Sequence, residues 1–216
     1  MSTWTLDNVK KMIGRQCGDP KATGYSSAIK DHLINAIESL AEDIVAIADI
    51  DRALTDDDRK RYSEVINISE NEIYPMLTEV PKIPSYSNKV ASFSITNSQF
   101  VKVIKVRDIF INPQIGVKIR FFRLMSMVEF NRHSTNPHLI ASEGEIFWLN
   151  LGNKIWVYNN GSGNYQLYFH CLTSLDYSGW TDSTNLQVLG FGTNFLTNAI
   201  SRAAYTMRLQ LGFEKE

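Results

Sequence analysis

Long apolar runs and cysteines are both scarce in this 216-residue chain. No apolar stretch approaches the ~20 residues that a membrane-spanning helix needs, and the first residues, MSTWTLDNVKK, lack the apolar core of a signal peptide. We therefore expect no membrane span and no targeting segment. The 2 cysteines exclude a disulfide framework, so Cys17 and Cys171 are expected to be small packed or exposed thiols.

Recognisable catalytic and metal-binding motifs are also missing. The 4 histidines form no HExxH pattern, and His133 and His138 have only Glu129 and Glu143 as nearby carboxylates. The GSG at 161–163 lacks the third glycine of a phosphate-binding GxGxxG and precedes an expected strand, so it indicates a hairpin turn. We expect no catalytic residue, no cofactor and no metal, and hence a protein that is not an enzyme.

The charge is divided unevenly along the chain. Residues 1–80 carry 9 basic and 15 acidic side chains, whereas residues 81–189 carry 10 basic and 6 acidic ones. An acidic part followed by a mildly basic part favours contacts between protein surfaces. Without a dense basic stripe, specific nucleic-acid binding is not expected.

Helical periodicity marks the first third of the chain. Apolar residues at three- and four-residue steps predict helices over 5–17 and 27–50. A third helix is predicted over 55–74, because Thr55 suits an N-cap, three aspartates follow it at the positive end of the helix dipole, and Pro75 ends the segment. Thr5 is the expected N-cap of the first helix.

Helical spacing returns at the end of the chain. A helix is predicted over 193–212, with Thr193 as its N-cap and alanines in its apolar stripe. Because small side chains permit close approach by a neighbour, we expect this helix to pack back on the N-terminal helices.

Between these helical parts the apolar period changes from about 3.6 to 2. Segments of strand length, rich in β-branched and aromatic residues, occupy residues 89–95, 100–106, 117–122, 145–149, 154–158 and 165–171. Residues 123–134 fit either a short helix or a turn-rich connection. Six strands without crossover helices predict an antiparallel sandwich or small barrel.

The predicted fold class is therefore α+β. A helical bundle over 1–80 is completed by the C-terminal helix in 190–216, and an antiparallel β-domain over 81–189 is inserted between them. The prolines at 81 and 84 mark the first boundary.

Aromatic residues crowd the last three predicted strands, and three uses remain open for them. They can fill the core, form a protein interface or make a stacking platform for a ligand. These residues are Trp148, Trp156, Tyr158, Tyr165, Tyr168 and Phe169.

Three segments carry a family resemblance. They are RLMSMVEFNRH at 123–133, the meander EIFWLNLGNKIWVYNNGSGNYQLYFHC at 145–171, and TNFLTNAISRAAYTMRLQLG at 193–212. Their order, after an acidic helical part, resembles the head-to-tail adaptor (connector) proteins of tailed bacteriophages, the tail tubular protein A-like components. The resemblance covers nearly the whole chain.

The resemblance implies a structural protein of the virion neck and tail, synthesised in the host cytoplasm. It would form a homo-oligomeric ring, normally of twelve copies, between the portal protein and downstream tail, nozzle or fibre proteins, with DNA passing through non-specifically. An acidic lining would let DNA slide, because it repels phosphate. The alternative is a non-catalytic binding module whose aromatic meander recognises a glycan or a fibre or tail protein.

Overall fold

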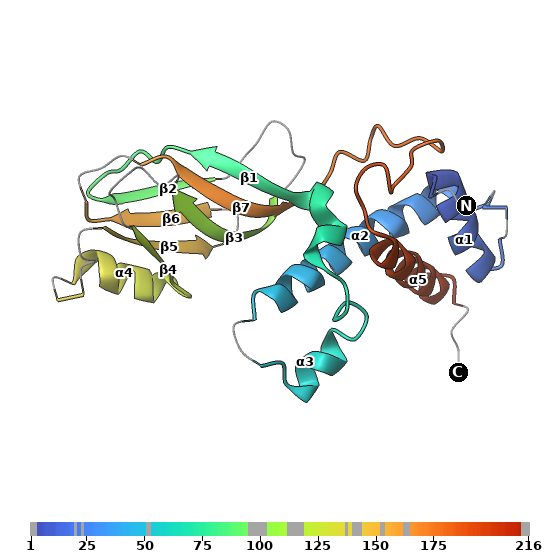
Figure 1. The fold of residues 1–216 in the computed structure, drawn as a ribbon, viewed down its shortest axis with the longest axis horizontal. Coiled ribbons are helices and arrows are strands. Elements are labelled where there is room, and N and C mark those ends of the chain that lie inside the picture. Colours follow the sequence, from blue (N-terminus) through green and yellow to red (C-terminus); the bar gives the residue numbers. More distant parts are fainter. Residues whose placement is uncertain are drawn as a thin grey trace. The chain divides into compact units, whose positions relative to one another are not determined.

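The computed structural model describes residues 4–19, 21–22, 24–50, 53–94, 103–111, 119–136, 138–139, 144–151, 154–161 and 165–212. The protein is of the α+β class, and its contacts divide it into two units (Figure 1). The helical unit consists of Met1–Leu77 and Ser174–Glu216, and the β unit is Thr78–Thr173.

The second boundary falls earlier than the sequence predicts. Residues 174–189 were expected to belong to the β-domain, but they lie in the helical unit. They are held there by main-chain hydrogen bonds to the start of the chain: the Leu6 amide donates to the Thr184 carbonyl at 2.8 Å, and the Leu186 amide donates to the Trp4 carbonyl at 2.9 Å. The segment has no helix or strand of its own, so its sequence gives no periodicity to follow.

The helical unit contains four α-helices and one 3-10 helix within the described residues. They are α1 (Leu6–Gln16), α2 (Ser26–Ala48), α3 (Asp56–Arg61), η1 (Glu70–Met76) and α5 (Thr193–Gln210). Two predicted N-caps are confirmed. The Thr5 side chain accepts from the Asn8 amide, and Thr55 forms a reciprocal capping box with Asp58.

The predicted helix over 55–74 is wrong. α3 ends at Arg61, turns follow, and η1 begins after Ser69, whose side chain accepts from the Asn71 amide. Asn67 and Ser69 stand in this interval, and short polar side chains of this kind compete with helical hydrogen bonds by bonding to nearby backbone. Val65, in the middle of the predicted helix, is buried, but it lies in a turn and not in a helix.

The start of α5 is capped from another element, which corrects the prediction for Thr193. The N-cap is Gly192, which has no side chain to offer. Instead, Glu72 of η1 accepts a hydrogen bond from the Phe195 amide at 2.9 Å, and its second oxygen accepts from the Asn194 side chain at 3.1 Å. A Cβ at position 192 would lie 2.3 Å from the Glu72 Cγ, so only glycine fits this approach.

α5 packs against α1, α2 and η1. Its inward stripe includes Ala199, Ala203 and Ala204, which are at most 1% exposed. Because these side chains are small, the backbone of α5 approaches its neighbours closely: the Cys17 thiol of the α1 C-cap lies 3.6 Å from the Ala204 carbonyl. Other buried residues of this core include Val9, Ile13, Ile29, Leu33, Ile37, Leu40, Ile73, Phe195 and Leu196.

The β unit contains two sheets within the described residues, ordered β1-β7-β3 and β2-β6-β5-β4. Its elements are β1 (Leu77–Lys82), β2 (Val90–Ser94), β3 (Val103–Ile111), β4 (Arg120–Arg123), α4 (Met127–Thr135), β5 (Glu145–Leu151), β6 (Lys154–Asn159) and β7 (Leu167–Thr173). The predicted strand residues 95, 100–102 and 117–118 lie outside the described residues.

The expectation of a wholly antiparallel β-domain is wrong. β4 pairs with β5 in parallel, with Arg120 opposite Glu145 and Arg123 opposite Trp148. Parallel neighbours need a crossover connection, and the segment that contains α4 provides it. Of the two alternatives for residues 123–134, the short helix is therefore correct. That helix lies in the crossover connection, which the sequence prediction did not include.

β1 is a strand that the sequence prediction missed. It lies at an edge of the three-stranded sheet, and Val80 points into the core with 5% exposure. Pro81 lies within it, a residue that edge strands tolerate because one side of the strand makes no ladder bonds. Of the two prolines that indicated a break, Pro81 therefore lies in an edge strand, and Pro84 follows its end.

The two sheets share one hydrophobic core. It contains Val80, Val106, Ile109, Ile146, Trp148, Ile155, Val157, Leu167, Phe169 and Cys171. A second cluster forms where α4 packs on β5, and it contains Leu124, Phe130, Phe147, Leu149 and Tyr158.

Replacing Glu72 tests the cap of α5. Glu72→Ala removes the acceptor for the Phe195 amide, so we expect the free energy of unfolding to fall by about 1–2 kcal/mol. Glu72→Gln keeps one oxygen acceptor and should lose less. Urea denaturation followed by helical circular dichroism measures the change. The matched control is Glu42→Ala, which removes an exposed carboxylate from α2; equal losses in Glu72→Ala and Glu42→Ala would contradict the cap.

Candidate interaction surfaces

Of the four residues considered for metal binding, His133 and Glu129 make contacts within the fold, and His138 is exposed. The His133 ring stacks on Phe147 at 4.4 Å, and its Nδ1 lies 3.0 Å from the Leu139 carbonyl. Glu129 accepts from the Met125 amide at the entry of α4, and Glu143 lies outside the described residues. In the part of the chain that the structure describes, no group of three or more His, Cys, Asp or Glu is placed to hold a metal.

Both cysteines are buried and free. Burial raises the pKa of the Cys17 thiol, and it raises the pKa of Cys171 to about 12. A thiol of this kind stays protonated at neutral pH, whereas the thiolate is the nucleophilic form. Their role in the structure is packing. Of the GSG segment only Gly161 is described, where its amide donates to the Asn159 side chain.

The strand register divides the six aromatics singled out in the sequence. Trp148, Tyr158 and Phe169 are at most 2% exposed and belong to the two cores. Trp156 is partly buried against Phe130, with ring centroids 6.2 Å apart. Tyr165 is partly buried against the shared core. The sequence could not separate these roles, because the aromatics of β5 and β7 alternate onto both faces and the sequence does not say which face is covered.

Tyr168 lies on the outward face of the three-stranded sheet. Its ring stacks on Phe110 of β3 at 5.3 Å, and Phe110 also lies 4.5 Å from the His170 ring. The His170 Nε2 lies 3.1 Å from a Glu79 carboxylate oxygen. We name Phe110, Tyr168 and His170 the aromatic sheet face. Flat rings with polar atoms at one side suit either a protein neighbour or a stacked ligand.

A second surface surrounds α4. Four large apolar side chains are exposed there: Phe122 at 37%, Met125 at 80%, Val128 at 65% and Leu139 at 43%. The Phe122 ring lies 5.3 Å from Phe147, which also carries His133. We name these four apolar residues, with Arg120 and Arg132, the α4 patch; Arg123 lies on the other face of β4, over the Trp148 ring. Sequence periodicity could not find it, because the exposed apolar residues come from a strand end, a helix and a loop.

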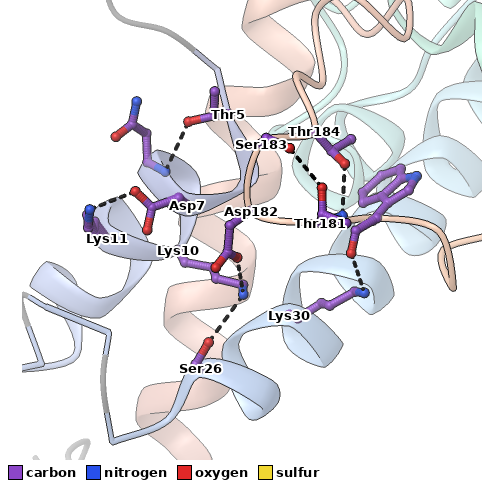
Figure 2. Close-up of polar contacts among 12 residues, drawn as sticks. Thr5, Asp7, Lys10, Lys11, Ser26, Lys30, Thr181, Asp182, Ser183 and Thr184 are labelled. Atoms are coloured by element: carbon purple, nitrogen blue, oxygen red, sulfur yellow. Dashed lines mark hydrogen bonds and ion pairs between the residues drawn. The ribbon is translucent and has the colours of Figure 1, made fainter.

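In the helical unit, residues 174–190 form a strap across α1 and α2 (Figure 2). Lys10 contacts Asp182 at 2.7 Å and Ser26 at 3.2 Å. Lys30 donates to the carbonyls of Tyr177 and Trp180, both at 3.1 Å. Two lysines from two helices thus fix the strap at separate points.

The strap also carries two carboxyls with lowered pKa values. The hydrogen bond from Lys10, and then the positive charge of that side chain, lower the pKa of Asp182. Hydrogen bonds from the Ser178 side chain and amide lower the pKa of Asp176. Both carboxyls are therefore ionised at neutral pH.

The solvent side of α2 is acidic. Asp31 and Glu42 are exposed, and Glu38 and Asp43 are partly exposed. Asp43 pairs with Arg202 of α5 at 2.9 Å. We name Asp31, Glu38 and Glu42 the acidic α2 face.

A groove of about 390 Å3 lies between α1 and α5. Its lining is mixed, and its single charged side chain is Arg15, so no acid–base pair converges there. The lining residues are Trp4, Met12, Arg15, Gln16, Thr197, Ile200 and Ser201. None of the helices in the described ranges is long and apolar enough to span a membrane.

A comparison with protein-family models and a comparison with curated proteins give no match to this chain.

Removing the charge of Lys30 tests the attachment of the strap. Lys30→Met keeps an apolar stem but leaves the Tyr177 and Trp180 carbonyls without this donor, so we expect a stability loss of about 1–2 kcal/mol. Amide hydrogen exchange within residues 174–190 should become faster. Lys21→Met, at an exposed loop position, is the control. Unchanged exchange in the strap of Lys30→Met would refute this role of Lys30.

Proposed function

We propose that this chain is a structural head-to-tail adaptor of a tailed bacteriophage, which assembles as a ring of twelve copies in the neck of the virion. The ring would bind the portal protein on one side and tail, nozzle or fibre proteins on the other. DNA would pass through its centre without sequence-specific contacts. The protein would act by binding neighbours and would not be an enzyme.

The observation that carries the proposal is the discontinuous helical unit around an inserted β unit. Residues from both ends of the chain share one core, in which α5 packs on α1 and α2. This is the organisation expected from the resemblance. The inserted β unit exposes apolar and aromatic side chains on the α4 patch and the aromatic sheet face, as a subunit with several neighbours requires.

The acidic α2 face supports the passage of DNA. DNA is retained when lysine and arginine neutralise its phosphates and release counterions. A carboxylate-rich helix does the opposite, so a bore lined by such faces would repel the duplex and leave it free to slide.

Mixing the chain with the portal ring of the same virus tests the proposal. We expect the two to co-migrate in light scattering, and electron microscopy should reveal an added ring of density on one face of the portal. The control is a portal ring mixed with an unrelated protein of similar mass. Persistent free chain at every ratio, with no added density, would refute the adaptor role.

A non-catalytic binding module is the second candidate, and the stacked Phe110–Tyr168 pair favours it. Two stacked rings on the outward face of a sheet can hold the apolar face of a sugar. In that case Tyr168→Ala should abolish glycan-array binding while leaving the unfolding temperature within a few degrees. Trp148→Ala is unsuitable as a probe, because Trp148 is 1% exposed and its loss would disrupt the core. Unchanged glycan binding in Tyr168→Ala would exclude the face as the site.

A further inference from the structure

One asparagine–glycine pair stands directly after β6. It is Asn160–Gly161, the only such pair in the sequence. Both residues are partly exposed, so water reaches them. A bond between the glycine amide nitrogen and the asparagine Cγ would close a five-membered ring, and glycine has no side chain to obstruct this approach. Whether two neighbouring groups of this kind react depends on the partners that the fold gives to each of them.

The asparagine side chain has a cationic partner. The Lys89 Nζ donates a hydrogen bond to the Asn160 Oδ1. This bond draws electron density away from the Asn160 Cγ, and it stabilises the negative charge that develops on the Oδ1 when a nucleophile adds to that carbon. The two residues are 71 positions apart in the chain, so only the fold brings them together.

The backbone of Lys89 is held in place by the surrounding strands. Asn88 and Lys89 have positive φ values of 51° and 67°. They form a turn that Ser87 and Val90 close with two main-chain hydrogen bonds of 2.8 and 3.0 Å, as in a two-residue hairpin. The Lys89 carbonyl also accepts from the Asn159 amide at 3.0 Å. The lysine side chain therefore starts from a fixed point beside the end of β6.

The glycine nitrogen also has a partner. The Gly161 amide donates to the Asn159 Oδ1 at 2.9 Å, and Asn159 is 4% exposed, so the acceptor is held firmly. The bond draws the proton away from the nitrogen and raises the electron density there. The proton that must leave and the oxygen that must receive electrons thus each have a hydrogen-bond partner.

We propose that Asn160 is a site of spontaneous deamidation and that Lys89 accelerates the reaction. The Gly161 nitrogen loses its proton to water and attacks the Asn160 Cγ. The bond from Cγ to the side-chain nitrogen breaks, and that nitrogen takes up a proton from water and leaves as ammonia. Water then adds to one of the two carbonyl carbons bonded to the Gly161 nitrogen in the resulting succinimide and breaks that C–N bond. The product is aspartate or isoaspartate at position 160.

Either product changes the end of β6. A carboxylate replaces a neutral amide beside Lys89, so a hydrogen bond becomes an ion pair. Isoaspartate also adds one carbon to the main chain between Asn159 and Gly161. The reaction needs only water, and the proposal does not depend on the adaptor role.

Incubation of the full chain at mildly alkaline pH, followed by peptide mapping with mass spectrometry, tests the proposal. The peptide that contains Asn160 should gain the mass difference between NH2 and OH, and water enriched in heavy oxygen should label it. Lys89→Met should slow this gain by roughly three- to tenfold, whereas Lys89→Arg keeps the positive charge and should react at nearly the wild-type rate. The matched control is Lys154→Met, an exposed lysine at the start of the same strand, which should leave the rate unchanged.

Further variants separate the contact from folding and from the local sequence. Lys89→Asn is a second neutral variant, and asparagine suits the positive φ of this position. In concentrated urea the wild type, Lys89→Met and Lys89→Asn should all react at one rate, because the lysine no longer lies beside Asn160. Asn160→Gln requires a larger ring and should abolish the gain.

Two results would overturn the proposal. One is a folded wild-type chain whose Asn160 peptide gains no mass. The other is an equal rate in the wild type and in whichever neutral Lys89 variants keep the wild-type circular dichroism. A rate difference that persists in urea would likewise show that the contact in the fold is not its cause.

Discussion

The contact between Glu72 and the start of α5 is the constraint on which the helical unit depends. One side chain of η1 accepts from the Phe195 amide and from the Asn194 side chain, and the Glu72 carbonyl accepts from the Gly192 amide at 3.0 Å. A negative charge at a helix N-terminus is also favoured by the helix dipole. Because the two partners are more than a hundred residues apart, this one carboxylate fixes where the chain re-enters the helical core.

Gly192 and the alanines of α5 serve the same close approach. Glycine leaves room for the Glu72 side chain, and Ala203 and Ala204 let α5 approach its neighbours. Arg202 lies outside this core and links Asp43 of α2 with Glu64, at 2.9 and 2.7 Å. The helix is therefore held by a cap at its start, small side chains along its inner face and an ion-pair network on its outer face.

The sequence predicted most helices and the packing of the C-terminal helix on the N-terminal ones, but not the individual bonds between distant segments. The N-caps at Thr5 and Thr55 depend on residues three positions away, so the sequence contains the whole signal. The cap of α5 comes from Glu72, far away in the chain, so no pattern in the residues around α5 predicts it. In the same way, the apolar stripe of α2 was enough to predict that helix. The break after Arg61, by contrast, depends on competition between helical hydrogen bonds and local hydrogen bonds from side chains.

For the β unit, the sequence predicted a domain built of strands, but it did not predict which strands pair with one another. Alternating residues identify strands, but the parallel partnership of β4 and β5 arises only because the chain passes through α4 between them. The candidate surfaces depend on that pairing. Trp148 and Tyr168 are both aromatic strand residues, yet register places one in the core and the other on the outward face. Exposure of this kind is a property of the folded sheet.

The discontinuity of the helical unit has a consequence for synthesis on the ribosome. When α1 and α2 emerge, the segment that covers their apolar side, residues 174–212, has not yet been made, and the entire β unit is translated first. The apolar sides of the nascent helices therefore remain exposed for most of translation, which favours chaperone binding or premature aggregation. Maturation of the helical unit is thus a late event, completed only once the final helix has left the exit tunnel.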